Sequence, residues 1–540
     1  MPQVASNRGI LLAMVMLTCL AVLCASCLTG CGPGPAASRE PSGGGPRGGG
    51  EAPGSGQTPG AGVGDGVSAP EWTPGEAGAV EVRREGNVAT AGPFRQLLGV
   101  TWVSDEEFLA LARHQGGESI VRFSRDRGGA WTGRAVLTLK QDALPEGFYM
   151  WAPLADGKSI VFTTLRESVL GPLWRYDIEP SGVEGRGVYK VTEPVNAVFR
   201  MSPDRARAVL YDNEGASMTD FRTGQKVRLP GVPSYEFPFV GIGCSWSPDG
   251  VHYLYQVVEG QVARWFGIVR TDTGTVVCRV APGKGCAFEA AWSPDGSRVA
   301  FLVLDGEGDT FLGPEDELIP PIAHRVGILE VGTGRVEYVS VPGKLVYGLP
   351  VWSPVGGALA FAAGTVEGSR TSGFRVSCDV HIAQEQAGQW VVTQVTGPAQ
   401  GKGAKLPLSW APDGTALAFS APSLEDEQCL WVGVVRSPGG SRGAAGSWLA
   451  PVMLGEVVTP VTWLDDHTLV GKVVLPGKQP HVREIRVFSA DGKVVSTVDG
   501  PAMFRELTVS PGGGYLAYTW DAVITDGSEP MTLLRIMPMR

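Results

Sequence analysis

The sequence has little positive charge for its length. Lysine and arginine number 45 against 55 aspartates and glutamates, a formal net charge of −10, and no block of basic residues occurs. Binding to a nucleic-acid backbone requires cations that neutralise phosphates, so this balance excludes a typical nucleic-acid-binding protein. A charged partner is expected to be a basic protein or ligand, or a hard cation.

The residues that carry most enzyme chemistry are also scarce. The sequence contains only six histidines, none of them spaced as metal ligands: His114, His252, His324, His381, His467 and His481. This scatter argues against a zinc site. No G-x-S-x-G segment occurs, which removes the nucleophile elbow of α/β-hydrolases. The sequence therefore names no catalytic residue.

Glycine and proline, in contrast, are plentiful. The 540 residues include 76 glycines and 41 prolines, and 43% are hydrophobic. Such a composition disfavours long helices and favours many short strands joined by turns. We therefore expect an all-β protein.

One long hydrophobic run occurs, close to the first residue. Arg8 precedes "GILLAMVMLTCLAVLCASC", and Leu28, Thr29 and Gly30 precede Cys31, a pattern typical of an export signal. It resembles the lipobox of bacterial lipoproteins. The resemblance implies a signal peptide over residues 1–30, lipid on Cys31, and an extracytoplasmic protein anchored to the bacterial cell membrane. An uncleaved transmembrane anchor is the alternative, because the run is about long enough to span a bilayer.

Residues 31–79 form a segment rich in glycine, proline and serine. Almost nothing in it can be buried, so we expect a flexible tether between the anchor and a folded domain at residues 80–540.

That domain contains a repeat. Four close copies are "SWSPDGVHYLY" from Ser245, "AWSPDGSRVAFL" from Ala291, "VWSPVGGALAFA" from Val351 and "SWAPDGTALAFS" from Ser409. Five degenerate copies begin at Thr101, Met150, Arg200, Thr462 and Thr508. Most copies lie 45 to 60 residues apart, which is close to the period of propeller blades.

Turn chemistry explains the repeated letters. In Ser-Pro-Asp-Gly, proline presets φ, aspartate tolerates the next turn position, and glycine adopts the left-handed conformation that closes a hairpin. A second turn recurs downstream, around Gly224, Gly274, Gly334 and Gly492, so each repeat predicts four antiparallel strands. Asp295 recurs as Asp249 and Asp413, which indicates a turn role and not catalysis. The recurring tryptophans indicate packing between blades.

The W-S-P-D-G corner and the apolar strand after it resemble the WD-like repeat of TolB-type β-propellers, over roughly Phe94 to Arg540. The resemblance implies a single propeller, and we expect eight or nine four-stranded blades. The last repeat has room for only three strands, so "AVEVRRE" from Ala79 is expected to supply its fourth and to close the ring.

Cys278 and Cys286 flank a short segment, "RVAPGKG", and an extracytoplasmic location would permit a disulfide between them. Free buried thiols are the alternative.

The loops after second strands are long and acidic. Because corners and third-strand turns share one face of the ring, these loops share the other. They carry a group that we call the acidic rim: Asp305, Glu307, Asp309, Glu315, Asp316, Glu317, Glu425, Asp426 and Glu427. The rim is expected to attract a basic partner or calcium, unless its charges are merely solvated. If the rim is only solvated, the binding site is expected among the loops that carry Tyr235, Phe237, Lys344 and Tyr347.

The sequence as a whole predicts a lipid-anchored propeller that binds an envelope protein or a ligand, needs no cofactor with the possible exception of calcium, and has no catalytic residues. The alternative function is that of an extracytoplasmic hydrolase or lyase, with convergent histidine and carboxylate side chains at the ring axis.

Overall fold

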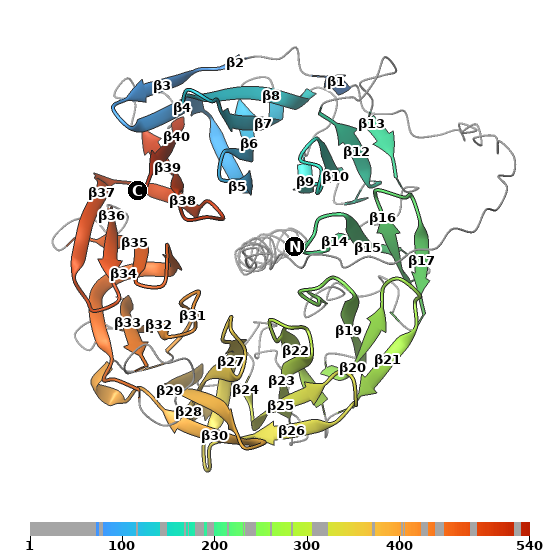
Figure 1. Ribbon diagram of the computed structural model, residues 1–540, viewed down its shortest axis with the longest axis vertical. Coiled ribbons are helices and arrows are strands. Elements are labelled where there is room, and N and C mark those ends of the chain that lie inside the picture. Colours follow the sequence, from blue (N-terminus) through green and yellow to red (C-terminus); the bar gives the residue numbers. More distant parts are fainter. Residues whose placement is uncertain are drawn as a thin grey trace, which may run out of the picture. The chain divides into compact units, whose positions relative to one another are not determined.

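The protein is a ring of nine four-stranded blades, as a computed structural model shows (Figure 1). The described residues are 72–74, 79–114, 117–140, 148–166, 169–170, 172–178, 188–191, 199–212, 215–230, 232, 245–259, 262–281, 285–304, 322–369, 373–400, 403, 405–422, 430–437, 448–475, 483–522 and 531–539. The predicted all-β propeller is confirmed. Apart from the 3-10 turn η1 (Pro398–Gln400), the regular elements of the described residues are strands.

The first three blades follow the degenerate repeats. Blade one contains β5 (Gln96–Ser104), β6 (Glu107–His114), β7 (Gly117–Arg125) and β8 (Trp131–Lys140). Blade two contains β9 (Phe148–Pro153), β10 (Ser159–Arg166), β12 (Trp174–Asp177) and β13 (Val188–Lys190), with β11 (Val169–Leu170) beside β10. Blade three contains β14 (Phe199–Met201), β15 (Arg207–Asp212), β16 (Gly215–Asp220) and β17 (Lys226–Leu229).

The next three blades begin at close copies of the repeat. Blade four contains β18 (Ser245–Trp246), β19 (His252–Glu259), β20 (Val262–Arg270) and β21 (Val276–Val280). Blade five contains β22 (Gly285–Trp292), β23 (Arg298–Leu304), β25 (Arg325–Glu330) and β26 (Val336–Val339). Blade six contains β27 (Leu345–Trp352), β28 (Ala358–Ser369), β29 (Gly373–Gln386) and β30 (Gln389–Gln394), with β24 (Ile322–Ala323) beside β27.

One long strand serves two of the last blades. Blade seven contains β31 (Leu408–Trp410), β32 (Ala416–Pro422), β33 (Leu430–Arg436) and the first half of β34 (Val452–Trp463). Blade eight takes the second half of β34, then β35 (Thr468–Val474), β36 (Arg483–Ser489) and β37 (Val494–Ala502). Blade nine begins with β38 (Phe504–Val509), β39 (Tyr515–Ala522) and β40 (Met531–Pro538).

The ring closes through an early strand, but not the predicted one. The fourth strand of blade nine is β4 (Val88–Phe94), which pairs with β40 at Ala89–Ile536 and Ala91–Leu534. The predicted segment instead supplies β3 (Val82–Glu85), a fifth strand outside β4, and β2 (Ala79–Val80), which pairs with β8 of blade one. The short strand β1 (Trp72–Pro74) comes before them in the chain. The prediction was wrong by one strand because β3 and β4 form a hairpin and either of its strands has the required length.

The hydrophobic core is divided among the interfaces between blades. At the junction of blades five and six, for example, Leu302 and Ile328 pack with Leu359 and Phe361. Because both faces of each sheet are covered by a neighbour, the second strands consist almost wholly of apolar residues. The core is therefore a series of sheet-on-sheet contacts around the ring.

The repeated tryptophan links the blades at five of these interfaces. Its indole Nε1 donates a hydrogen bond to the inner strand of the preceding blade, to the residue just before the tryptophan position there. The bonds are Trp246 to the carbonyl of Arg200 at 2.9 Å, Trp292 to Ser245 Oγ at 3.1 Å, Trp352 to Ala291 at 2.9 Å, Trp410 to Val351 at 3.0 Å and Trp463 to Ser409 at 3.1 Å. The tryptophans are thus links between blades, as their recurrence predicts.

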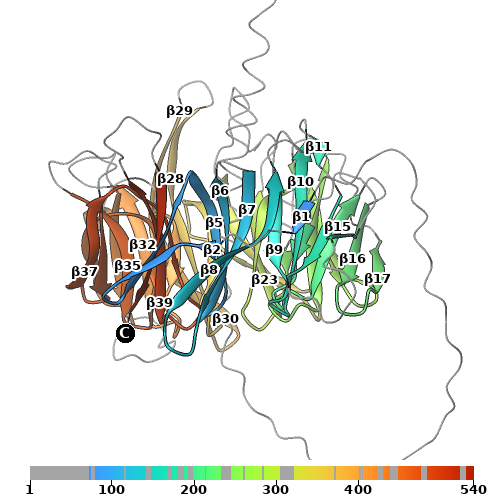
Figure 2. The ribbon, with the colours of Figure 1, turned by 90° about the horizontal axis from the view of Figure 1, so that it is seen from above.

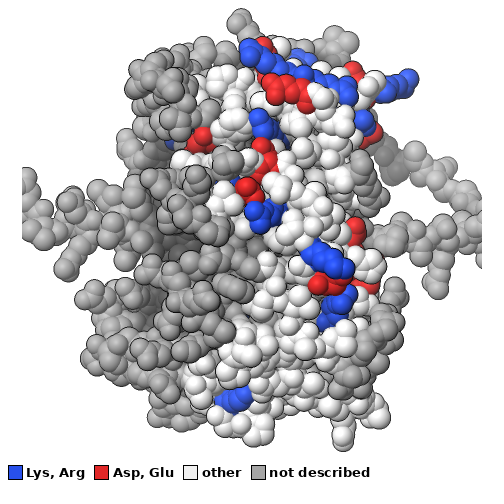
Figure 3. Space-filling model, turned by 90° about the vertical axis from the view of Figure 1, so that its left-hand side faces the viewer, with Lys and Arg blue, Asp and Glu red and all other residues white. Residues whose placement is uncertain are grey.

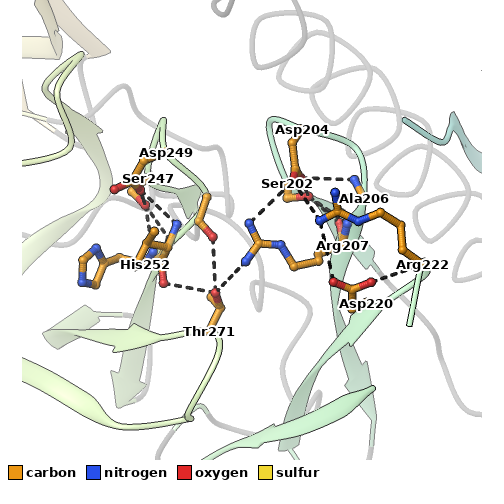
Figure 4. Close-up of polar contacts among 12 residues, drawn as sticks. Ser202, Asp204, Ala206, Arg207, Asp220, Arg222, Ser247, Asp249, His252 and Thr271 are labelled. Carbon is orange, nitrogen blue, oxygen red and sulfur yellow. Dashed lines mark hydrogen bonds and ion pairs between the residues drawn. The ribbon is translucent and has the colours of Figure 1, made fainter. Parts of the chain in front are cut away.

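The corners are built by side-chain hydrogen bonds within each turn. Figure 4 shows two of them: Ser247 Oγ donates to Asp249 Oδ1 at 2.5 Å and accepts from the His252 amide at 2.8 Å, and Ser202 and Asp204 repeat the arrangement. Asp295 does the same, accepting from Ser293 Oγ at 2.6 Å and from the Ser297 amide at 3.1 Å. These bonds hold the pKa of Asp295 below its usual range against the opposing effect of burial. In the described structure, these contacts of Asp295 support the turn.

We predict that Trp292→Ala lowers the free energy of unfolding by about 3–5 kcal/mol, because it empties a large aromatic site and removes a link between blades. Asp295→Ala should cost about 1 kcal/mol, since it removes only local turn support. Denaturant unfolding of both variants measures the difference, and the reverse ranking would contradict the structural role of the repeat.

Candidate functional site

The acidic rim itself, residues 305–317 and 425–427, lies outside the described residues, but the strand ends next to it are described. The loops after second strands leave the ring after Leu304 of β23, Ser369 of β28, Pro422 of β32 and Ala522 of β39. Each of these strands starts at a corner, so all four loops leave from the face opposite the corners, which we call the loop face. Figure 2 shows β28 and β29 projecting from that face.

Of the other predicted residues, Cys31, Tyr235 and Phe237 also lie outside the described part of the chain. Lys344 and Tyr347 belong to the start of the inner strand of blade six. Lys344 Nζ donates to Gln394 Oε1 at 3.1 Å. Tyr347 is half-buried in β27, and burial raises its pKa. Both residues are therefore parts of the blade wall.

The two predicted disulfide cysteines lie opposite different parts of β20. Cys278 pairs with Ile268 and Cys286 with Ala263. Five positions along a strand correspond to about 16 Å, well beyond the Cα separation that a disulfide spans. Cys278 has a free thiol, whose pKa is raised by burial. Because the two cysteines lie opposite such distant positions of β20, the described structure has no bridge between them.

The described histidines come from five different blades: His114, His252, His324, His381 and His467. Within the described residues, no group of three or more His, Cys, Asp or Glu side chains has an arrangement that would hold a metal ion. In the same residues, no helix has the length and hydropathy needed to cross a bilayer.

One histidine belongs to a buried polar cluster in blade six. Lys405, 2% exposed, donates from Nζ to Asp379 Oδ1 at 3.0 Å and to the Cys378 carbonyl at 3.1 Å. Gln394 Nε2 donates to the other oxygen of Asp379 at 3.0 Å. His381 Nδ1 lies 2.9 Å from the Asp379 carbonyl, while its Nε2 is buried without a partner among the described residues.

This cluster fixes the crossing from blade six to blade seven. Lys405 lies in the segment between β30 and β31. Its ammonium donates a hydrogen bond to Asp379 in β29, a strand of the preceding blade. Removing either member of such a pair would leave an unpaired buried charge. Because Lys405, Asp379 and Gln394 satisfy one another, the cluster is better suited to holding the fold than to binding a ligand.

A different arrangement lies at the axis of the ring. Several inner strands bulge a few residues before the tryptophan position, where the inner strand has one or two residues more than the second strand opposite it. The bulges lie at residue 98 in β5, 287–289 in β22, 348–350 in β27, 459–461 in β34 and 505–506 in β38. Bulges redirect side chains and are common near functional sites. We call this series the axial collar.

In blade nine the axial collar carries two adjacent charges. Arg505 and Glu506, both exposed, occupy the bulge of β38, the strand of that blade nearest the axis (Figure 1). Arg505 Nε donates to Asp521 Oδ2 at 2.7 Å, and Thr532 Oγ1 lies 3.2 Å from the other oxygen of Asp521. Since Asp521 is buried and Arg505 is 54% exposed, the pair presents the guanidinium to solvent.

Lys472 of β35 joins this group from blade eight. Its Nζ donates to the Arg505 carbonyl at 2.8 Å. Burial lowers the pKa of Lys472, and the charge of Arg483 lowers it further, whereas burial raises the pKa of Glu506. Glu506 meets water, yet protein surrounds it closely enough to disfavour its charge, as expected for a carboxyl in a confined position on the inner wall.

Sequence reasoning missed this group, although a signal was present. The segments before the tryptophan position read "GLPVW" and "TPVTW" in blades six and eight, but "FRELTV" in blade nine. Two adjacent charges on an inner strand could have indicated a polar position at the axis.

The described part of the outer wall that Figure 3 shows carries charges of both signs. On the side turned to the viewer in Figure 3, basic side chains lie next to acidic ones on a mostly uncharged wall. Blade eight provides two such pairs, Arg486 with Glu484 at 2.6 Å and Lys493 with Asp491 at 3.2 Å. A solvent-exposed pair such as Lys493 with Asp491 contributes little to stability.

Comparison with known proteins gives likenesses in shape alone. No family model and no curated protein sequence matches the chain. Among solved structures, the β-propeller domain of Myceliophteria thermophila Cps50 (Swd1) is 11% identical, covers 63% of this chain and 96% of its own, and has a TM-score of 0.34. Porphyromonas gingivalis dipeptidyl peptidase 4 is 11% identical with a TM-score of 0.47, covering 80% of this chain and 65% of the peptidase. An oligogalacturonate lyase in complex with manganese is 13% identical with a TM-score of 0.36, covering 82% and 98%. Likenesses this distant carry no residue role over to this chain.

His381 gives the fold a measurable pH dependence. Burial lowers its pKa from the ordinary 6.5, so the folded state resists protonation more than the unfolded chain does. Stability is complete above the unfolded pKa and falls as the pH drops below about 6.5, with a limiting slope of about 1.4 kcal/mol per pH unit. His381→Asn should flatten this dependence in urea titrations between pH 7 and 5. His467→Asn, at an exposed turn, is the control and should leave the slope unchanged; an equal effect of both would refute the assignment.

Proposed function

We propose that the protein is a lipid-anchored propeller outside the cytoplasm that acts as a binding scaffold in the cell envelope. The loop face would hold a basic protein or ligand through the acidic rim. The anchor rests on the resemblance of "LTGC" at Leu28 to Cys31 to a lipobox. The binding role rests on where the acidic loops leave the ring.

One observation carries the binding role: the strands that flank the two most acidic segments end on the same face. β23 ends at Leu304 and β32 at Pro422, in blades five and seven, with a single blade between them. Carboxylates that leave one face of a ring add to a common field, which falls off over about 8 Å at physiological salt. Such a field favours association with a basic surface and fades as salt is added.

The residues of the repeat favour a binding function in the loops, because the repeat residues themselves are already engaged in structural contacts. The recurring aspartates are occupied in their own corners and the recurring tryptophans in links between blades. Function is then left to the connecting segments, where a rigid scaffold usually displays it.

The alternative function, an extracytoplasmic hydrolase or lyase, has one observation in its favour. Lys472 and Glu506 lie in the same axial group and have pKa values shifted towards neutrality from opposite sides, as acid and base catalysts often do. None of the histidines in the described residues contacts either side chain in the hydrogen bonds and ion pairs found there. Binding is therefore the better supported function.

The lipid anchor is tested at Cys31. Metabolic labelling with a fatty-acid analogue should mark the wild type, and Cys31→Ala should lose the label. Cys27→Ala is the matched control, because it removes a neighbouring cysteine and should keep the label. Equal labelling of the wild type and Cys31→Ala would reject the anchor.

The acidic rim is tested by charge reversal. Replacing Glu315, Asp316, Glu425 and Asp426 with lysine should weaken recovery of cross-linked partners from intact membranes and reduce the salt sensitivity of what remains. The melting temperature should barely change, since exposed loop charges contribute little to stability.

A control variant with lysine at Glu81, Glu85, Asp272 and Asp491, which are exposed elsewhere on the ring, has the same net charge and should keep its partner. If calcium is the ligand, the wild type alone should melt at a higher temperature when calcium is added. Unchanged partner recovery by the rim variant, together with no calcium effect, would show that the rim is only solvated.

A further inference from the structure

The guanidinium of Arg505 is held in place by Asp521, but only one of its nitrogens is paired in the described structure. Asp521 fixes its Nε at 2.7 Å, and the two terminal nitrogens have no hydrogen-bond partner among the described residues. A guanidinium anchored through Nε keeps its remaining donors in a plane, which suits a carboxylate better than a flexible ammonium does. The side chain is thus pre-oriented towards solvent at the axis.

Lys472 and Glu506 extend the same surface. The ammonium of Lys472 donates one hydrogen bond to the Arg505 carbonyl at 2.8 Å, and its other two donors have no hydrogen-bond partner among the described residues. Glu506 follows Arg505 in the bulge, and its carboxyl accepts no hydrogen bond in the described structure, while its amide is held by Thr519 Oγ1 at 2.9 Å. Two cations with free donors therefore adjoin one carboxyl with free acceptors.

If these three side chains served only to join blades eight and nine, their donors and acceptors would be expected to pair with one another. The bond from Lys472 to the Arg505 carbonyl does join the two blades. The terminal nitrogens of Arg505 do not contribute to that junction in the described contacts, and the carboxyl of Glu506 adds an electrostatic attraction to Lys472 without a hydrogen bond. They are left at the innermost strand of a ring whose net charge is otherwise acidic.

We propose that Arg505, Lys472 and Glu506 form a binding site at the axis for a small hydroxycarboxylate. Arg505 and Lys472 bind the carboxylate, and Glu506 accepts a hydrogen bond from the neighbouring hydroxyl. This site is separate from the acidic rim and goes beyond the proposed scaffold function, so either can fail alone.

The test uses the full chain in detergent and calorimetric titration with three probes: L-malate, succinate and inorganic phosphate. Malate and succinate differ by one hydroxyl, so we expect malate to bind several-fold more tightly. Arg505→Ala should weaken malate binding at least tenfold. Arg270→Ala is the matched control, because Arg270 also pairs with an aspartate, Asp272, at 2.7 Å but lies at a third-strand turn; it should leave binding unchanged.

Arg505→Ala leaves Asp521 buried without its cation, so a second variant protects the test against misfolding. Glu506→Gln keeps the shape of the side chain and should retain succinate binding while losing the preference for malate. The site is refuted if the wild type binds neither carboxylate, if Arg505→Ala and Arg270→Ala weaken binding equally, or if Glu506→Gln retains the preference. Phosphate binding as tight as malate binding would refute the assignment to a carboxylate.

Discussion

The structure depends on the packing of one sheet face against the next, which five of the repeated tryptophans reinforce with an indole hydrogen bond to the preceding blade. A single blade cannot cover its own apolar faces, so each blade is stable only between two neighbours. The tryptophan spans the interface and donates to a backbone carbonyl or a serine of the inner strand, which fixes the height at which adjacent blades meet. With that height fixed, all corners lie on one face and all second-strand loops on the other.

The junction between the last blade and the first is one of those without this bond in the described residues. Trp102 is buried there, but its Nε1 has no partner among the described residues. Other contacts replace the link: Asp105 Oδ1 accepts from the Gly512 amide at 2.8 Å, and Tyr515 packs edge-on against Trp131 with Arg125 over its ring. The strand pairing of β4 with β40 adds a backbone connection. The ring is thus closed by a strand from the early part of the chain.

Rigidity and function are divided between different residues. The corners use their serines and aspartates within the turn, and blade six buries Asp379 with Lys405, so these polar groups are not free for a ligand. The bulges of the axial collar work in the opposite way, because they interrupt the pairing of inner strands and turn residues such as Arg505 and Glu506 out of the ladder. Propellers can vary such positions without loss of the fold, since the packing between blades lies further out.

The sequence by itself determined the all-β class, the number of repeats within one, and the structural role of Asp295 and Trp292, because these follow from local turn chemistry and from a period that recurs along the chain. Only the tertiary structure decided which strand closes the ring, that Cys278 and Cys286 face positions of β20 five residues apart, and that Lys472 of one blade meets Arg505 of the next. Each of these depends on register between segments distant in the sequence or on a bulge of one or two residues. A change of register or a bulge of this kind leaves the hydrophobic pattern of the sequence unchanged. It therefore cannot be predicted from that pattern.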